Sequence, residues 1–317
     1  MKFHWNNGDW YINDFLAMQL DTMLYNIKKD WDFIILITGD RMVRVGKSVL
    51  AQIISAYLAY RLAMIKEYTT DKSNGKILNK DAYTIHDIHF DNKEMMDAAF
   101  KKPKYSIDHY DEGREGLAAN KAMGQMQKDL IDFFTECGQM NHIFVIVAPD
   151  FFDLKEDMAV ARSEILINVY RKSENKMMDI YNEGEKIPVT VFSRGHFEFF
   201  SRKKKAMLYD SYRTSRRKWY GAVKCDFLGD FTNQYPIGEE EYRQKKRDSL
   251  ARFQQKKEDE KKQKEGVRDQ RMRMQRDKMV EMLHKDGVPI KEIAEILGIT
   301  KQSLYQSAEQ TGVMLVK

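Results

Sequence analysis

A glycine, a lysine and a serine at positions 46 to 48 form the segment of this sequence best suited to bind phosphate. They stand between an apolar run, Phe33–Ile37, and a stretch with helical spacing that begins at Lys47. Backbone N–H groups at a helix N-terminus bind polyphosphate, a lysine reaches its terminal oxygens, and a serine hydroxyl can ligate Mg²⁺. The pattern therefore predicts a phosphate-binding loop formed by Arg44, Val45, Gly46, Lys47, Ser48 and Val49.

The loop departs from the usual pattern GxxxxGK[ST], which has its first glycine at the place held here by Arg41. The nearest glycine is Gly39, two residues earlier. Either the loop carries a two-residue insertion, or Gly39 only opens the turn and residues 41–45 wrap the phosphates without a leading glycine. In the second case Arg41 or Arg44 can contact phosphate directly.

An acidic pair, Asp111 and Glu112, follows the run Tyr105–Tyr110. Cleavage of a nucleoside triphosphate needs one acidic group for Mg²⁺ and a second group that orients the attacking water. We interpret Asp111 as the metal-side carboxylate, together with Ser48, and Glu112 as the catalytic base. Asp108 interrupts the apolar run and is a competing metal-side candidate.

A third apolar run, Ile143–Ala148, is followed by Asp150, which can place a polar group near the γ-phosphate or simply cap the next helix. Phosphoryl transfer also commonly uses an arginine, from the same chain or from a neighbouring subunit. We rank the candidates in the order Arg162, Arg171 and Arg194.

The elements that must position these residues alternate between apolar runs and helical stretches. The runs are Phe33–Ile37, Ile143–Ala148, Ile165–Val169 and Val189–Phe192, and the helix candidates are Phe15–Lys28, Lys47–Lys66, Lys121–Cys137 and Asp153–Ser163. Fully apolar strands between helices are typical of a parallel sheet covered on both faces, so we expect an α/β fold. Val189–Phe192, His196–Ser201 and Ala206–Tyr212 are predicted to be late antiparallel strands, with a turn at Arg194-Gly195.

Together, Gly46-Lys47-Ser48, Asp111-Glu112 and the following strand resemble the additional-strand, catalytic-glutamate P-loop ATPases. The resemblance covers roughly residues 25–215 and is nearest to the HerA/FtsK-type DNA-pumping ATPases, including zonular-occludens-toxin-like and viral packaging proteins. It implies a RecA-like core, Mg²⁺-dependent hydrolysis of ATP, and a ring of identical subunits, often a hexamer, with ATP at the subunit borders.

The composition changes after Gly238, where a long run of charged residues with few apolar ones begins. We predict three parts: an ATPase domain over 1–236, a charged helical connector over 237–278 and a small all-α domain over 279–317. The connector fits a solvated helix; alternatively, it follows a phosphate backbone or pairs with a partner helix.

Residues 288–306 resemble a helix-turn-helix of the resolvase-like or regulator type. Ala294 stands where two helices cross closely, Gly298 makes the turn, and the expected small core is Ile293, Leu297, Ile299 and Leu304. The second helix would present Lys301, Gln302, Ser303, Tyr305 and Gln306 to base edges and phosphates of DNA. A helical hairpin for protein contacts is the alternative, and the basic residues 268–278 favour DNA.

The composition excludes several other classes. The 317 residues include only two cysteines, without a CxxC pair, so neither a disulfide scaffold nor a thiolate zinc site is expected. The apolar runs are far shorter than the about 20 residues of a membrane span, and the N-terminus does not resemble a signal peptide, so a cytoplasmic protein is expected. We expect a DNA motor or remodeller; the alternatives are an ATP-switched DNA-binding regulator or transposition/replication helper, and a terminase-like packaging ATPase.

Overall fold

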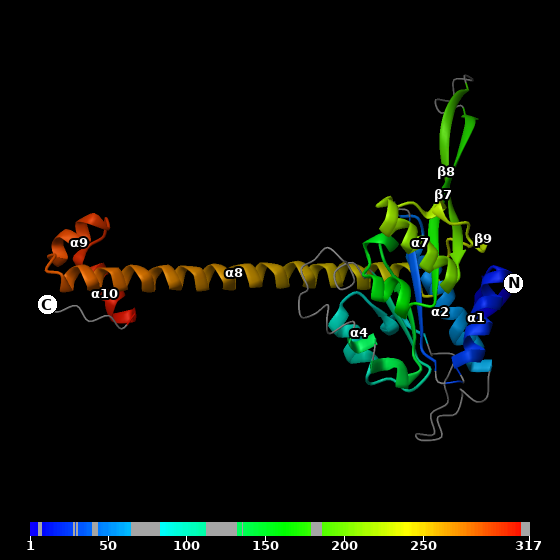
Figure 1. The fold of residues 1–317 in the computed structure, drawn as a ribbon, viewed down its shortest axis with the longest axis horizontal. Helices are drawn as coiled ribbons and strands as arrows, with labels where there is room; N and C mark the ends of the chain where they lie inside the picture. The colour runs from blue at the N-terminus through cyan, green and yellow to red at the C-terminus, as the bar shows by residue number, and fades with distance from the viewer. Residues whose placement is uncertain are drawn as a thin grey trace. The chain divides into compact units, whose positions relative to one another are not determined.

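The computed structural model describes residues 1–5, 8–27, 29, 31–39, 44–64, 83–111, 132–134, 136–178 and 186–311. The chain divides into two compact units, Met1–Lys246 and Arg247–Lys317. Each unit is described by itself below, and Figure 1 shows the elements of both.

The first unit is built on a seven-stranded sheet with the order β4-β5-β6-β3-β7-β8-β9. The strands from β4 to β7 run parallel to one another, and β8 and β9 are antiparallel additions. The strand bounds are β3 Phe33–Gly39, β4 Ile88–His89, β5 Ile107–Asp111, β6 Ile143–Val147, β7 Ile165–Met178, β8 Ile187–Phe200 and β9 Phe227–Asp230. The predicted α/β class with a mainly parallel sheet is confirmed.

Helices cover both faces of this sheet because its central strands are apolar on both sides. In β3, Phe33, Ile35 and Ile37 join one buried cluster, whereas Ile34 and Leu36 join the other. Helices α1 (Asp14–Ile27) and α2 (Lys47–Met64) contribute to the first cluster, and α4 (Asn92–Ala99) and α7 (Arg202–Ser215) contribute to the second. A sheet buried on both faces explains the continuous apolar runs of the sequence.

Short elements complete the first unit. A two-stranded antiparallel sheet pairs β1 (Lys2–Trp5) with β2 (Gly8–Tyr11). The short helical turns are η1 Ile85–Asp87, η2 Cys137–Met140, η3 Phe151–Asp153, η4 Asp157–Arg162 and η5 Tyr220–Ala222. The predicted helices over Phe15–Lys28 and Lys47–Lys66 are confirmed as α1 and α2, whereas Asp153–Ser163 forms only η3 and η4. Most of the predicted helix Lys121–Cys137 lies outside the described residues.

The late antiparallel region differs from the prediction. Val189–Phe192 and His196–Ser201 belong essentially to one strand, β8, and Arg194-Gly195 is an irregularity within it rather than a turn between two strands. The pairing with β7 shifts register between Tyr170 and Lys172, as a β-bulge does when one strand carries extra residues. Beyond this point, β7 and β8 continue as a two-stranded ribbon with no further strand beside it in the described sheet (Figure 1).

The predicted strand Ala206–Tyr212 is wrong, because these residues form part of helix α7. Lys205, Leu208 and Tyr209 are its buried residues. Their spacing of three and four places one face of a helix against the sheet, which the alternation of a strand cannot do.

The second unit contains the later part of α8 (Glu239–Lys285), then α9 (Ile290–Ile296) and α10 (Lys301–Thr311). Val280, Ile293 and Leu304 form its small core, and Val288, Ile290 and Ile299 pack against it. Gly298 has φ +67° between α9 and α10, as a tight turn requires. Leu297 was expected in this core but is 36% exposed. Within the described ranges, every helix is too short or too polar to cross a membrane.

Candidate nucleotide-binding site

The candidate residues meet at the carboxyl edge of the parallel strands. Ile37 on β3 and Asp111 on β5 both pair with Val147 on β6, so the three strands end at one edge. Gly39 pairs with Val169 on β7 at the same edge. Ligands of open α/β sheets bind at this edge, because the loops that leave it lead into the helix N-termini.

The two ends of the loop between β3 and α2, at Gly39 and at Val45–Lys47, lie close together. A side chain on Gly39 would lie 3.1 Å from Val45 and 3.2 Å from Lys47, so a glycine is needed where the two ends of the loop meet. Gly46 has φ +105°, which only glycine adopts easily, and its carbonyl accepts the N–H of Leu50 in the first turn of α2. Arg41 and the rest of residues 40–43 lie outside the described residues.

The Ser48 hydroxyl at the start of α2 lies beside the Asp111 carboxyl at the end of β5. Asp111 is buried, and burial raises the pKa of its carboxyl, but Lys246, His109, the hydrogen bond from Tyr242 and the Ser48 hydroxyl lower that pKa below its usual value. The carboxylate is therefore ionised at neutral pH. A serine hydroxyl and an ionised carboxylate are oxygen donors of the kind that Mg²⁺ prefers, so these two residues fit the ion.

This donor set suits a magnesium ion shared with a nucleotide better than an all-protein metal cage. Among the described residues, no group of three or more His, Cys, Asp or Glu side chains could hold a metal ion. Mg²⁺ commonly binds through one or two protein groups, substrate phosphates and retained water, which Ser48 and Asp111 beside Lys47 would allow.

Asp108, the competing candidate, lies three residues earlier on β5 and away from the loop. It is fully buried and forms an ion pair with Lys102, and its carboxyl oxygens lie 3.3 Å from His142 Nδ1 and 3.6 Å from His89 Nε2. The structure thus brings Asp111, and not Asp108, to Ser48. Glu112, the proposed base, lies outside the described residues.

Asp150 follows β6 at the same edge and acts as a cap. Its side chain accepts the N–H of Phe152 at 3.2 Å and the hydroxyl of Tyr220 at 3.2 Å. The Tyr220 oxygen in turn accepts the hydroxyl of Thr38 on β3, at 3.1 Å. The capping role weighed above is therefore present in the structure.

The three arginine candidates lie at different edges of the sheet. Arg162 precedes β7, and the N–H of Glu164 donates to the carbonyl of Ile34 near the start of β3, so Arg162 lies at the edge opposite the loop. Arg171 comes two residues after Val169, the partner of Gly39, and its guanidinium lies 5.6 Å from the Phe192 ring. Arg194 precedes Gly195, which lies against Phe231, a neighbour of Gly46. Only Arg171 and Arg194 share an edge with the loop of their own chain.

Sequence reasoning missed the segment that leads into α8. The Phe231 ring lies 3.0 Å from where a Cβ on Gly46 would stand, and the Tyr242 hydroxyl donates to Asp111 Oδ2. The only available signal was a single tyrosine within the charged run after Gly238.

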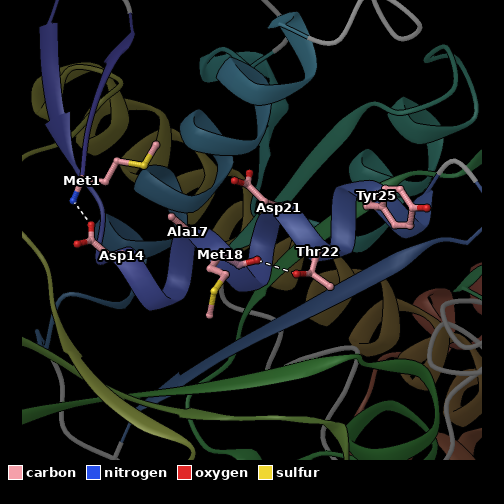
Figure 2. Close-up of a pocket in the computed structure, with 7 residues that line it drawn as sticks. All are labelled: Met1, Asp14, Ala17, Met18, Asp21, Thr22 and Tyr25. Atoms are coloured by element: carbon pink, nitrogen blue, oxygen red, sulfur yellow. Dashed lines mark hydrogen bonds and ion pairs between the residues drawn. The ribbon is translucent and has the colours of Figure 1, made fainter.

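A separate groove of about 490 Å³ lies on α1 and does not coincide with this site (Figure 2). It is lined by Met1, Asp14, Ala17, Met18, Asp21, Thr22 and Tyr25. None of these residues belongs to the loop or to the acidic strand, so the groove adds nothing to the candidate site.

The predicted DNA-contacting residues belong to the second unit. Lys301, Gln302, Ser303 and Gln306 are exposed and Tyr305 is half-buried, whereas Leu304 between them is buried. Thr300 Oγ1 accepts the N–H of Ser303 at 3.2 Å, as expected of a residue that caps α10.

Comparison with known proteins gives no family match and no curated relative. Among solved structures, the chain is similar to the N-terminal domain of zonular occludens toxin from Neisseria meningitidis (12% identity, 67% of this chain and 97% of that chain, TM-score 0.31). It is also similar to the genome packaging NTPase B204 from Sulfolobus turreted icosahedral virus 2 in complex with ATP-gammaS (11% identity, 55% and 94%, TM-score 0.31). A third is the flagellar accessory protein FlaH from Methanocaldococcus jannaschii (17% identity, 54% and 85%, TM-score 0.26). Because all three TM-scores are low, the fold is assigned from its own strand order.

Proposed function

We propose that this chain is a Mg²⁺-dependent ATPase that acts on DNA as a motor or remodeller. The observation that supports it most is the meeting of Ser48 and Asp111 at the start of α2, beside Lys47. One oxygen donor at the start of α2 and another at the end of β5, next to a lysine and a glycine with positive φ, suit a metal–triphosphate.

In this proposal, each residue has one task. Residues 44–49 and Lys47 bind the phosphates, and Ser48 and Asp111 hold Mg²⁺, which neutralises the charge that develops on the phosphoryl group. Glu112 accepts a proton from the attacking water. Arg171 or Arg194 serves the site of its own chain, whereas Arg162, at the opposite edge, serves a neighbouring subunit of a ring.

Two substitutions test the hydrolytic part. Lys47→Ala should abolish binding of a fluorescent ATP analogue, and Glu112→Gln should retain binding but stop phosphate release. Lys203→Ala, an exposed lysine on α7, is the matched control for lost charge and should leave both unchanged. Normal turnover in Glu112→Gln would exclude it as the base, and unchanged ATP binding in Lys47→Ala would contradict the nucleotide site.

The DNA part of the proposal is supported by the exposed polar face of α10 and by the basic residues 268–278 before it. Processive strand or duplex displacement with DNA-stimulated turnover is the result expected of a motor. The alternative, an ATP-switched DNA-binding regulator, would show ATP-dependent occupancy of a DNA site with slow turnover instead. Sedimentation with and without a nonhydrolysable ATP analogue tests the proposed ring.

A further inference from the structure

The segment between β9 and the first turns of α8 packs along the candidate site, and we call residues 231–246 the strap. The Phe231 ring contacts the Gly46 region, and the N–H of Ile237 donates to Gln52 Oε1 on α2 at 3.4 Å. Lys245 Nζ donates to the carbonyl of Ile85 at 2.8 Å. The strap therefore contacts the phosphate-binding loop, α2 and the segment that precedes β4.

Tyr242 is the strap residue that reaches the metal-side groups. Tyr242 is 4% exposed, its hydroxyl donates to Asp111 Oδ2, and it lies near the Ser48 hydroxyl. The ring packs against Tyr235 at 5.5 Å and against Phe90 at 5.9 Å. These contacts hold the phenol against Asp111, one of the two groups that fit Mg²⁺.

Lys246, one turn further along α8, also disfavours a metal ion at Asp111. Its ammonium lies 5.7 Å from the Phe90 ring and 6.0 Å from the Tyr242 ring, and it is the nearby charge that most lowers the pKa of Asp111. A positive charge already beside Asp111 repels a second cation at the same carboxylate. In addition, Mg²⁺ demands near-ideal octahedral geometry, which a phenol bound to the Asp111 carboxylate obstructs.

We propose that the strap is an autoinhibitory contact: Tyr242 bound to Asp111, and a Mg²⁺–nucleotide bound at Asp111 and Ser48, exclude each other. This inference rests on the proposed function. Binding of the metal–nucleotide releases the first turns of α8, and by linkage anything that pulls α8 from the site strengthens metal binding by the same factor. The helix that carries Tyr242 continues to Lys285. Binding of the nucleotide would therefore change the first turns of the helix that leads to the second unit.

The first test is hydrogen exchange of the full-length wild-type chain. We expect the amides of residues 239–246 to exchange at least about tenfold faster with Mg²⁺ and a nonhydrolysable ATP analogue than with the analogue and EDTA, because their docked state is lost. Unchanged or slower exchange in this segment would overturn the inference. No substitution is needed, so the result does not depend on a variant that folds.

The second test is the Mg²⁺ dependence of analogue binding in Tyr242→Phe, which keeps the packed ring and removes the hydroxyl. Loss of a hydrogen bond to a charged group should tighten Mg²⁺ binding by about tenfold. Tyr235→Phe, the same change in the adjacent ring of the strap, should leave it unchanged. Weaker Mg²⁺ binding in Tyr242→Phe would mean that the phenol supports the site and would contradict autoinhibition.

The two proposals fail differently. If the analogue binds wild type and Lys47→Ala equally, there is no nucleotide site and the proposed function fails. If binding needs both Lys47 and Mg²⁺ but the strap exchanges at the same rate in both states, the function stands and the strap inference fails.

Discussion

Two aspartates three residues apart on β5 have different neighbours. Burial raises the pKa of Asp108, but His142, His89 and the Lys102 ammonium hold it well below the usual value. These neighbours are themselves fixed, so Asp108 serves the fold. Asp111 at the strand end lies beside Lys246 and His109 and accepts a hydrogen bond from the Tyr242 hydroxyl, which a cation can displace.

This difference predicts opposite consequences of the same substitution. Asp108→Asn should lower the free energy of unfolding by about 3 kcal/mol, because the largely buried Lys102 ammonium loses the more deeply buried of its two carboxylate partners. Asp111→Asn should retain most of the stability and lose Mg²⁺-dependent turnover. Urea unfolding and ATPase assays on both variants check the assignment. Normal turnover in Asp111→Asn, with lost turnover in a folded Asp108→Asn, would reverse it.

A second prediction at this scale concerns Lys205, which is fully buried on α7 and donates to the carbonyls of Val160 and Ser163. Burial lowers the pKa of its ammonium from 10.5 to about 7; Arg202 acts in the same direction and Glu164 opposes it. Between these two values the unfolded chain binds the proton and the folded chain does not, so this group makes stability rise with pH.

The expected gain from pH 7 to pH 9 is about 2 kcal/mol, and Lys205→Met should lack it. Lys203→Met, an exposed neighbour on the same helix, should keep the wild-type slope. Urea unfolding at several pH values gives the comparison. Parallel profiles for wild type and Lys205→Met would show that Lys205 is not the titrating group.

The sequence predicts the arrangement of residues best where they are neighbours along the chain. A strand, a loop and Gly46-Lys47-Ser48 before a helix are consecutive in the chain, so their arrangement could be predicted. The contact of Asp111 with Tyr242 joins positions 131 residues apart, and no local pattern encodes such a pair. Likewise, only the strand register shows that Asp108 and Arg162 lie away from the loop.

At the scale of elements, the bulge in β8 positions the strap against the loop. Gly195 has φ +88°, its carbonyl accepts the N–H of Phe231 at 2.8 Å, and the Phe231 ring then contacts the Gly46 region. The irregularity that interrupts the ladder thus connects the antiparallel edge of the sheet to the candidate site. Bulges commonly redirect a strand beside a functional site.

Gly195→Ala tests this connection. A Cβ there would lie 2.4 Å from the Phe231 carbonyl oxygen, a backbone atom that cannot move alone. We expect a loss of about 2–3 kcal/mol in the free energy of unfolding, together with weaker ATP-analogue binding. In Gly138→Ala the nearest atom would be 3.8 Å away, so this control should remain within about 0.5 kcal/mol of wild type. Wild-type stability and binding in Gly195→Ala would contradict the connection.

The elements themselves were predictable where hydrophobic pattern and length agree, as in β3, β6, α1 and α2. The predicted turn at Arg194-Gly195 was wrong, because a glycine within a strand pattern suggests a turn. The structure instead has one continuous strand, β8, with a bulge there. The pattern also failed at Ala206–Tyr212, where mixed polar and aromatic residues suit either element. The buried face of Lys205, Leu208 and Tyr209 becomes visible only once the sheet provides the surface that they cover.

At the scale of the whole molecule, the chain combines a unit with the features of a nucleotide site and a unit with an exposed polar helix. The strap ends at Lys246, where the first unit ends, and α8 continues into the second. The proposed release of the strap would therefore act on the helix that joins the two units. The net charge of +5 averages over these parts, and the clusters of basic residues around 202–205, 213–218 and 268–278 are more informative than the sum.

The DNA-binding role of the second unit is tested by Lys301→Ala on α10. Loss of one phosphate contact should weaken DNA binding and reduce the slope of log affinity against log salt by about 0.9, and basal ATPase should be unaffected. Lys285→Ala removes the same charge from a lysine at the end of α8 that pairs with Glu281 at 2.7 Å, and its affinity and slope should match wild type. Deleting residues 280–317 should remove this contribution altogether. Unchanged DNA affinity in the deletion variant would assign the second unit to protein contacts, because a helical hairpin with an exposed polar face serves either partner.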